Sequence, residues 1–165
     1  MDEMSAAIVY LSQGVPFIQA GQEFLRSKGG NGNSYNSSDA VNSLKWSTLP
    51  TNIAVNNYYK GLIALRTSHP AFRLTTAAAI KSNLTFLPTL DGVVAYSLDG
   101  AKSKDSWKKI VVAFNATTTT QSVLLPTSGT WKIVVSGGSA GTKVLSTTKG
   151  SQVKVPAQTT FVLEQ

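Results

Sequence analysis

Residues 15–20, VPFIQA, form a short apolar run bounded by glycines. This pattern is typical of a strand that is covered on both faces, as in a parallel sheet. Such a strand needs hydrogen-bonded neighbours on both edges, and the adjoining sequence supplies no parallel one. The run must therefore belong to a larger α/β domain or be added to a sheet formed further along the chain.

Two predicted helices flank this run. Residues 2–13 begin with acidic residues and are followed by Gly14 and Pro16, which are stop signals for a helix. The second helix can be capped by Thr51 or Asn52 and ends before a His-Pro pair at positions 69–70. Its apolar positions have helical spacing and are Val55, Tyr58, Tyr59, Leu62 and Leu65. The order helix, strand, long loop, helix therefore predicts that residues 1–72 are the terminal αβα section of a larger α/β domain.

From Leu84 the pattern changes to short strands separated by turn residues, and the domain change falls within residues 71–83. Trp131 alternates with Ile133 and Val135, which predicts that Trp131 lies in the core. The expected strands are residues 84–87, 93–98, 108–115, 121–125, 130–135, 143–147, 152–155 and 159–164. This spacing favours an antiparallel β-sandwich over residues 73–165 and an α+β composite for the whole chain.

Composition excludes several classes of function. The chain of 165 residues carries a net charge of +7, but only three of its 15 cations are Arg and the Lys residues are scattered. A nucleic-acid footprint needs clustering on one face, so we expect no nucleic-acid partner. No apolar run approaches the roughly 20 residues that span a bilayer, and no signal peptide is recognisable, so no membrane association is expected. The absence of cysteine excludes disulfides, and the Thr-, Ser- and Asn-rich strands favour an extracellular enzyme.

The carboxylates do not predict a complete catalytic site. A glycosidase needs two carboxyl groups that face each other about 5–9.5 Å apart. Six of the eight acids lie at the chain ends or in apparent turns: Asp2, Glu3, Asp91, Asp99, Asp105 and Glu164. Only Glu23 and Asp39 remain, both in a loop, which is poor support for a catalytic pair. The single histidine, His69, is predicted to cap or pack a helix end, and no metal or cofactor motif is present.

The polar loop after residue 20 is about 30 residues long, beyond the length at which loops are usually functional or disordered. Amides, a phenol, a carboxylate and an indole match the hydroxyls and ring faces of sugars. These side chains belong to Asn31, Asn33, Tyr35, Asn36, Asp39, Asn42 and Trp46, and the loop also carries Arg26. We therefore predict a carbohydrate-binding loop, with a disordered Gly/Asn/Ser linker as the alternative.

Several segments of the sequence also resemble a known protein family. SQGVPFIQAGQEFLRSKGGNGNSYNSSDAVNSLKW (12–46) and YYKGLIALRTSHPAF (58–72) resemble the eighth strand, its loop and the last helix of type I pullulanases. IVVAFNAT (110–117) and PAQTTFVLE (156–164) resemble their C-terminal β domain. Pullulanases are debranching enzymes of the α-amylase clan, and the resemblance covers essentially the whole chain. It implies that residues 1–72 are the C-terminal section of a (β/α)₈ barrel.

The resemblance implies hydrolysis of α-1,6-glucosidic linkages in pullulan, amylopectin and limit dextrins, with retention of configuration. In that family the three catalytic carboxylates come from strands four, five and seven, upstream of this chain, and Met1 resembles an internal methionine. The implied partners are an α-glucan and the remaining N-terminal part of the same enzyme. The residues that match substrate-cleft positions are Asn33, Tyr35, Asp39 and Asn42, and those that match loop-shaping positions are Glu23 and Arg26. Ser38 and Lys45 depart from the family pattern.

A second hypothesis is a free-standing carbohydrate-binding or interaction module built on the β-sandwich. It would bind glucan through exposed aromatic side chains such as Trp107 or Trp131. Trp107 lies beside Lys108 and is expected to be exposed, whereas the alternation around Trp131 favours the core.

Overall fold

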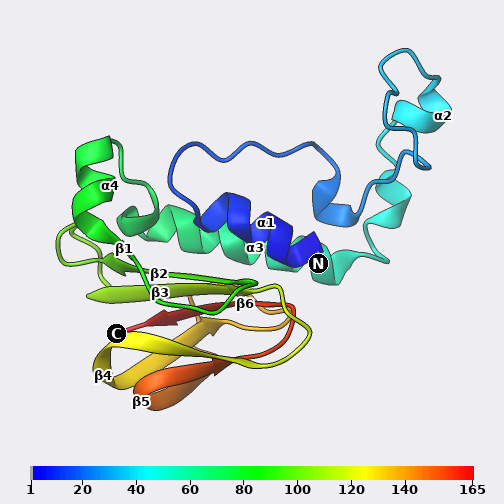
Figure 1. The fold of residues 1–165 in the computed structure, drawn as a ribbon. Helices are drawn as coiled ribbons and strands as arrows, with labels where there is room; N and C mark the ends of the chain where they lie inside the picture. The colour runs from blue at the N-terminus through cyan, green and yellow to red at the C-terminus, as the bar shows by residue number, and fades with distance from the viewer. Residues whose placement is uncertain (1) are drawn as a thin grey trace.

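The computed structural model describes residues 2–165, which form a layer of helices on one face of an antiparallel sheet (Figure 1). Met1 lies outside the described residues. The helices are α1 (Asp2–Leu11), α2 (Asp39–Asn42), α3 (Ile53–Ser68) and α4 (Ala77–Asn83), with short 3₁₀ helices η1 (Gln22–Phe24), η2 (Trp46–Thr48) and η3 (Pro70–Phe72). The strands are β1 (Leu84–Phe86), β2 (Val93–Asp99), β3 (Lys109–Asn115), β4 (Gln121–Val135), β5 (Ser146–Val155) and β6 (Thr159–Glu164).

The two long helices, α1 and α3, pack against each other and confirm the predicted helices. Tyr10 of α1 meets Tyr59 of α3 edge to face, with ring centroids 6.0 Å apart. The predicted apolar positions of α3 are buried apart from the partly buried Val55. Gly61 of α3 lies so close to Ala140 that an added Cβ would be 2.0 Å from its carbonyl oxygen. Every helix within residues 2–165 is too short or too polar to span a bilayer.

The sheet has six strands in the order β1-β2-β3-β6-β4-β5, all paired antiparallel. Two pairs of predicted strands are fused. Residues 121–125 and 130–135 both belong to β4, which continues through a register shift between Leu124 and Gly129. Residues 146–147 and 152–155 likewise belong to β5. The predicted sandwich of two sheets is therefore corrected to one continuous sheet, and Gly129, which resembled a turn residue, lies at an irregularity within the long strand β4.

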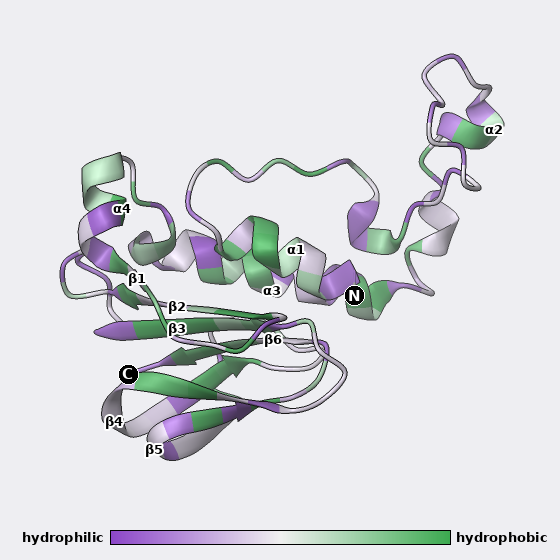
Figure 2. Cartoon of the chain, viewed as in Figure 1, coloured by the Kyte–Doolittle hydropathy of each residue, from purple (hydrophilic) through white to green (hydrophobic). Residues whose placement is uncertain are grey.

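This single sheet curls on itself and buries residues on both faces. Val93 of β2 and Val155 of β5 share one apolar cluster, although β3, β6 and β4 separate their strands in the hydrogen-bonded order. Trp131 lies in that inner cluster and is fully buried, as predicted. The other face packs on α1 and α3 through a second cluster that includes Val112 and Phe114 of β3. Figure 2 shows the hydrophobic residues concentrated where these layers meet.

Residues 12–20 arch over α1 without forming a strand (Figure 1). The side chain of Val15 is 94% exposed and that of Phe17 is 90% exposed. The segment takes no place in the six-stranded sheet, so the alternative in which it joins that sheet is wrong. The strand predicted at residues 15–20 does not form, because residues 2–165 offer no neighbouring strand with which its backbone could pair.

The junction between the helices and the sheet centres on a buried carboxylate. Oδ1 of Asp105 lies 2.7 Å from Nδ1 of His69, and Oδ2 accepts a hydrogen bond of 3.1 Å from the Ala71 N–H. The ring of Trp107 stacks on that of His69, with centroids 3.5 Å apart. The packing role predicted for His69 is confirmed. The prediction that Trp107 is exposed is wrong, because its indole is half-buried against this histidine.

Candidate functional site

The candidate site is the loop of residues 21–52, which projects away from the sheet at one end of the helix layer (Figure 1). It is largely hydrophilic (Figure 2). It begins where the exposed segment 15–20 ends and returns to the body of the molecule at α3. Its geometry depends on how both ends are held.

The chain that leads from α1 into the arch and the loop is held at its start by a buried arginine. The guanidinium of Arg66 donates hydrogen bonds of 2.7 Å to the carbonyls of Tyr10 and Ser12 and a third to that of Gly14. The Tyr96 hydroxyl donates a bond of 2.7 Å to the Leu11 carbonyl. These donors satisfy carbonyls that the end of α1 leaves unpaired. Burial lowers the pKa of Arg66, and the nearby Arg73 adds to this effect.

A tight turn at residues 21–26 forms the first part of the loop. The Gly21 N–H donates to Oε2 of Glu23 at 2.9 Å, and the Arg26 N–H donates to the Gly21 carbonyl at 2.8 Å. Gly21 has a φ of +97°, and a Cβ there would lie 2.8 Å from Cβ of Arg26. Only glycine fits this turn without strain, because it has no Cβ. Glu23 and Arg26 therefore both make contacts that define the turn.

An aromatic contact closes the base of the loop. Phe24 is fully buried, and its ring lies 5.1 Å from that of Trp46, centroid to centroid. The side-chain amide of Asn52 donates to the carbonyls of Phe24 at 3.0 Å and Thr48 at 3.2 Å. The indole of Trp46 remains 60% exposed. One ring thus covers Phe24 and also presents apolar surface to solvent.

The tip is organised around Asn42. Its side-chain amide donates to the backbone carbonyls of Ser34 at 2.6 Å and Ser37 at 2.9 Å. The backbone carbonyl of Asn42 accepts a hydrogen bond from the Arg26 guanidinium. Lys28 adds a bond of 2.7 Å to the Ser34 hydroxyl. Asn42 was predicted to contact substrate, but its amide donors are used within the loop. The buried Ser34 was missed, since nothing in a Ser/Asn-rich sequence distinguishes the serine that will be enclosed.

The remaining predicted contact residues lie on the surface of the tip. Tyr35 is 85% exposed, and Asn33 and Asp39 are also exposed. Asp39 opens the short helix α2. The backbone N–H of Asn33 is taken by the Asn31 side chain at 3.0 Å, whereas its side chain reaches solvent. The structure thus places a phenol, an amide and a carboxylate on one solvent-facing tip.

Three carboxylates of the described residues serve separate local contacts. Glu23 accepts from the Gly21 backbone, Asp105 pairs with His69, and Glu164 pairs with Lys132 at 2.9 Å. Within residues 2–165, no three His, Asp or Glu side chains gather as a metal site would require. The chemistry available on the loop is therefore hydrogen bonding and ring stacking.

Comparisons with known proteins agree with the resemblance found in the sequence. Residues 80–139 match the family model described as the pullulanase all-beta domain. A pullulanase of Bacillus subtilis (strain 168) is 46% identical over 113 residues, covering 68% of this chain and 16% of that protein. The crystal structure of the same organism's type I pullulanase complexed with maltose is 36% identical, with a TM-score of 0.90 over 99% of this chain and 23% of that one.

The solved pullulanase from Bacillus acidopullulyticus is 47% identical, with a TM-score of 0.94 over 99% of this chain and 20% of that chain. The chain spans only about a fifth of the length of these relatives. Its fold and sequence together confirm the family resemblance, and the chain matches a small C-terminal part of pullulanases.

Proposed function

We propose that this chain is part of a glycoside hydrolase that cleaves α-1,6-glucosidic linkages in pullulan, amylopectin and limit dextrins with retention. The observation that carries the proposal is the match to a pullulanase structure over 99% of this chain at 47% identity. The complex of a similar pullulanase with maltose supports an α-glucan as the ligand class. The chain contributes one side of the substrate cleft, and the catalytic carboxylates come from the preceding part of the enzyme.

In this proposal, residues 1–72 are the C-terminal section of a (β/α)₈ barrel and residues 73–165 are the C-terminal β domain. The exposed side chains of Val15 and Phe17 support the barrel assignment. In a closed barrel such side chains lie between neighbouring strands and helices, where their apolar surface is removed from water. The remainder of the enzyme supplies those neighbours.

The loop of residues 21–52 then follows the eighth strand and lies on the face where barrel enzymes place their active sites. Asn33, Tyr35 and Asp39 contact the glucan: the amide and carboxylate bond to hydroxyls, and the phenol ring stacks on a sugar face. Asn42 lines the same cleft and also holds the tip in shape through its amide. Glu23 and Arg26 hold the turn from which the tip projects.

Retention requires two carboxyl groups about 5–5.5 Å apart, one as nucleophile and one as acid/base. Glu23 is engaged with the Gly21 backbone and Asp39 lies exposed at the tip, so neither is held in such a pair. The role of this chain is therefore to orient the glucan against carboxylates that lie on the other strands of the barrel. Orientation of this kind contributes to rate by fixing the reacting geometry.

A chimera tests the proposal. Residues 2–165 replace the matching segment of the Bacillus acidopullulyticus pullulanase, and release of reducing sugar from pullulan is measured. We expect turnover by the chimera and none by the isolated chain. Tyr35→Ala and Asp39→Ala should each raise KM with the chimera still folded, whereas Lys45→Ala, at another exposed loop position, should not. A folded chimera without activity, or robust turnover by the isolated chain, would contradict the proposal.

The free-standing binding module is not supported by a specific contact. Trp131 is fully buried in the inner core, and its indole N–H donates to the Thr127 carbonyl at 3.2 Å. Trp107 is stacked on His69. Trp131 therefore presents no face to a sugar, and one face of the Trp107 ring is covered by His69.

A further inference from the structure

An apolar groove runs between α1 and the β1–β2 edge of the sheet. We call it the α1–β1 groove; its volume is about 610 Å³, and its apolar walls include Ile8, Ile80, Leu84, Phe86, Val94 and Phe114. The groove is separate from the loop of residues 21–52, and it meets the arch over α1 only at the first two residues of the arch, Ser12 and Gln13. The proposed function does not yet assign it a role.

We infer that the α1–β1 groove receives the barrel helix that precedes α1 in the complete enzyme. The inference rests on the proposed function, because it takes the barrel arrangement as its starting point. It adds a specific partner: an amphipathic helix whose apolar side lies against the β domain as well as against α1.

The walls of the groove expose more apolar surface than a sheet edge normally leaves in water. Phe86 is 69% exposed and Val94 is 51% exposed, while Ile8 contributes from α1 with 45% exposure. The ring of Phe86 leans edge-on against buried Tyr96, with centroids 6.2 Å apart. This arrangement leaves the outer ring face of Phe86 open. A contiguous apolar surface of this kind marks an interaction site in a soluble protein.

The surroundings of α1 identify which element fits there. One side of α1 packs on α3 through Tyr10 and Tyr59, and its lower face packs on the sheet. Residues 12–20 cross above it (Figure 1). The side that carries Ile8 opens onto the groove. In a (β/α)₈ barrel the helices form a closed ring, so each helix has a neighbour on both sides. Here α3 is one neighbour of α1, and the groove lies where the other belongs.

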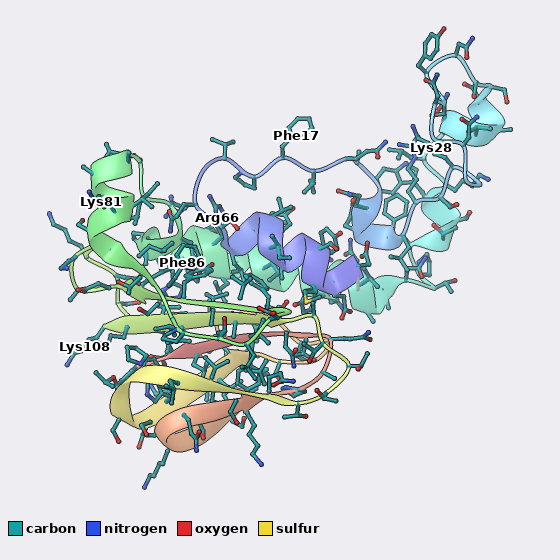
Figure 3. All side chains as sticks on the ribbon, in the orientation of Figure 1. Phe17, Lys28, Arg66, Lys81, Phe86 and Lys108 are labelled. Carbon is teal, nitrogen blue, oxygen red and sulfur yellow. The ribbon has the colours of Figure 1, made fainter. Side chains whose placement is uncertain are left out.

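The groove is distinct from the surface that closes the barrel interior. Figure 3 labels Phe17 on the arch above α1 and Phe86 on the sheet side of the same helix. In the proposed barrel, Phe17 contacts the barrel strands and Phe86 contacts a neighbouring helix. About four-fifths of the length of the relatives lies outside the part that this chain matches, which is enough to supply both the strands and the helix. The β domain would then support three barrel helices instead of two.

Hydroxyl-radical footprinting of the chimera tests this assignment. We expect protection of Phe86 and Val94 at least about fivefold above the value for the same side chains in the unfolded chimera, since interface cores exclude water. Leu124, which is 56% exposed on β4 and lies outside the groove, is the matched control and should remain reactive. Phe86→Asp should also lower the thermal unfolding midpoint of the chimera, and Leu124→Asp should not.

The outcomes separate the two proposals. If the chimera cleaves pullulan while Phe86 and Val94 stay as reactive as Leu124, the inference is overturned and the proposed function stands. If protection appears only as the chimera concentration rises, the groove binds a second copy and the inference is again overturned. A chimera that folds but has no activity contradicts the proposed function, and with it the basis of the inference.

Discussion

Two stretches of similar apolar character differ in burial in this molecule. IVVAFN of β3 is fully or almost fully buried, whereas VPFI at residues 15–18 arches through solvent with Phe17 90% exposed. β3 has hydrogen-bonded neighbours on both edges, in β2 and β6, and apolar clusters on both faces. The arch has no hydrogen-bonded strand beside it, and only Ile18 of VPFI is partly buried against the core cluster. Burial is therefore decided by whether the chain supplies neighbours, and not by hydrophobicity alone.

The largest expected effect concerns the closed region. Trp131→Ala removes a fully buried side chain from the inner cluster and should lower the free energy of unfolding of the chain by about 3–5 kcal/mol. Urea unfolding measures the loss. Leu124→Ala, at an exposed position of the same strand, should change it by less than about 0.5 kcal/mol. Equal effects of the two substitutions would show that β4 has no protected face.

The next effect tests the connection between the two regions. Arg66→Met leaves the carbonyls of Tyr10, Ser12 and Gly14 without their donor and should cost about 2–4 kcal/mol of unfolding free energy. Arg73→Met is the control. Arg73 also donates to two carbonyls but is exposed, so its loss should cost less than about 1 kcal/mol. If both variants unfold at the same urea concentration as the parent chain, the end of α1 does not depend on this capping.

A pH dependence should follow from the buried face of α3. Burial raises the pKa of Tyr58 and of Tyr59 to about 12 from 10. Because the folded-state value is the higher one, their contribution to stability is complete below pH 10 and is lost as the pH rises towards 12. Each tyrosine should reduce the unfolding free energy by up to about 1.4 kcal/mol per pH unit in that window. Unfolding midpoints measured from pH 9 to 11.5 should fall less steeply in Tyr58→Phe and Tyr59→Phe; an unchanged slope in both would contradict this.

The smallest effect is expected at the arch, and only while it lacks neighbours. Phe17→Ser should change the stability of the isolated chain by less than about 0.5 kcal/mol, because the side chain is already in water. In the pullulanase chimera the same substitution should cost more than about 2 kcal/mol, as for other large buried side chains. Paired unfolding curves provide the measurement. A similar small change in both proteins would mean that the arch stays exposed in the complete enzyme.

Local patterns predicted the two long helices and most of the strands, because those signals are contained within each element, but the strand expected at residues 15–20 does not form and α4 was not predicted. The helical spacing of Tyr58, Leu62 and Leu65 and the His-Pro stop at its end placed α3 almost to the residue. The fused strand β4 could not be predicted in the same way. Gly129 has a φ of +150° and resembles a turn in sequence, and only pairing with β5 shows that the strand continues.

The binding role of the loop stays a prediction, and only part of its shape could be predicted. Tyr35 and Asp39 are exposed at its tip, as a sugar-binding role would require. The inward hydrogen bonds of Asn42 and the enclosure of Ser34 depend on how the loop folds back on itself. Sequence spacing does not encode such contacts, because amides and hydroxyls face inwards or outwards with equal ease.

The shared apolar cluster between α1, α3 and the sheet has a consequence for how related genes can recombine. Residues on both sides of position 72 contribute to it, from Leu11 and Leu62 in the helices to Val112 and Phe114 in the sheet. A crossover within residues 73–83 would join helices from one parent to a sheet from another across a packed surface. Substitutions on the two faces should therefore co-vary among homologues, and viable crossovers should fall upstream of α1, which keeps this cluster in one inherited block.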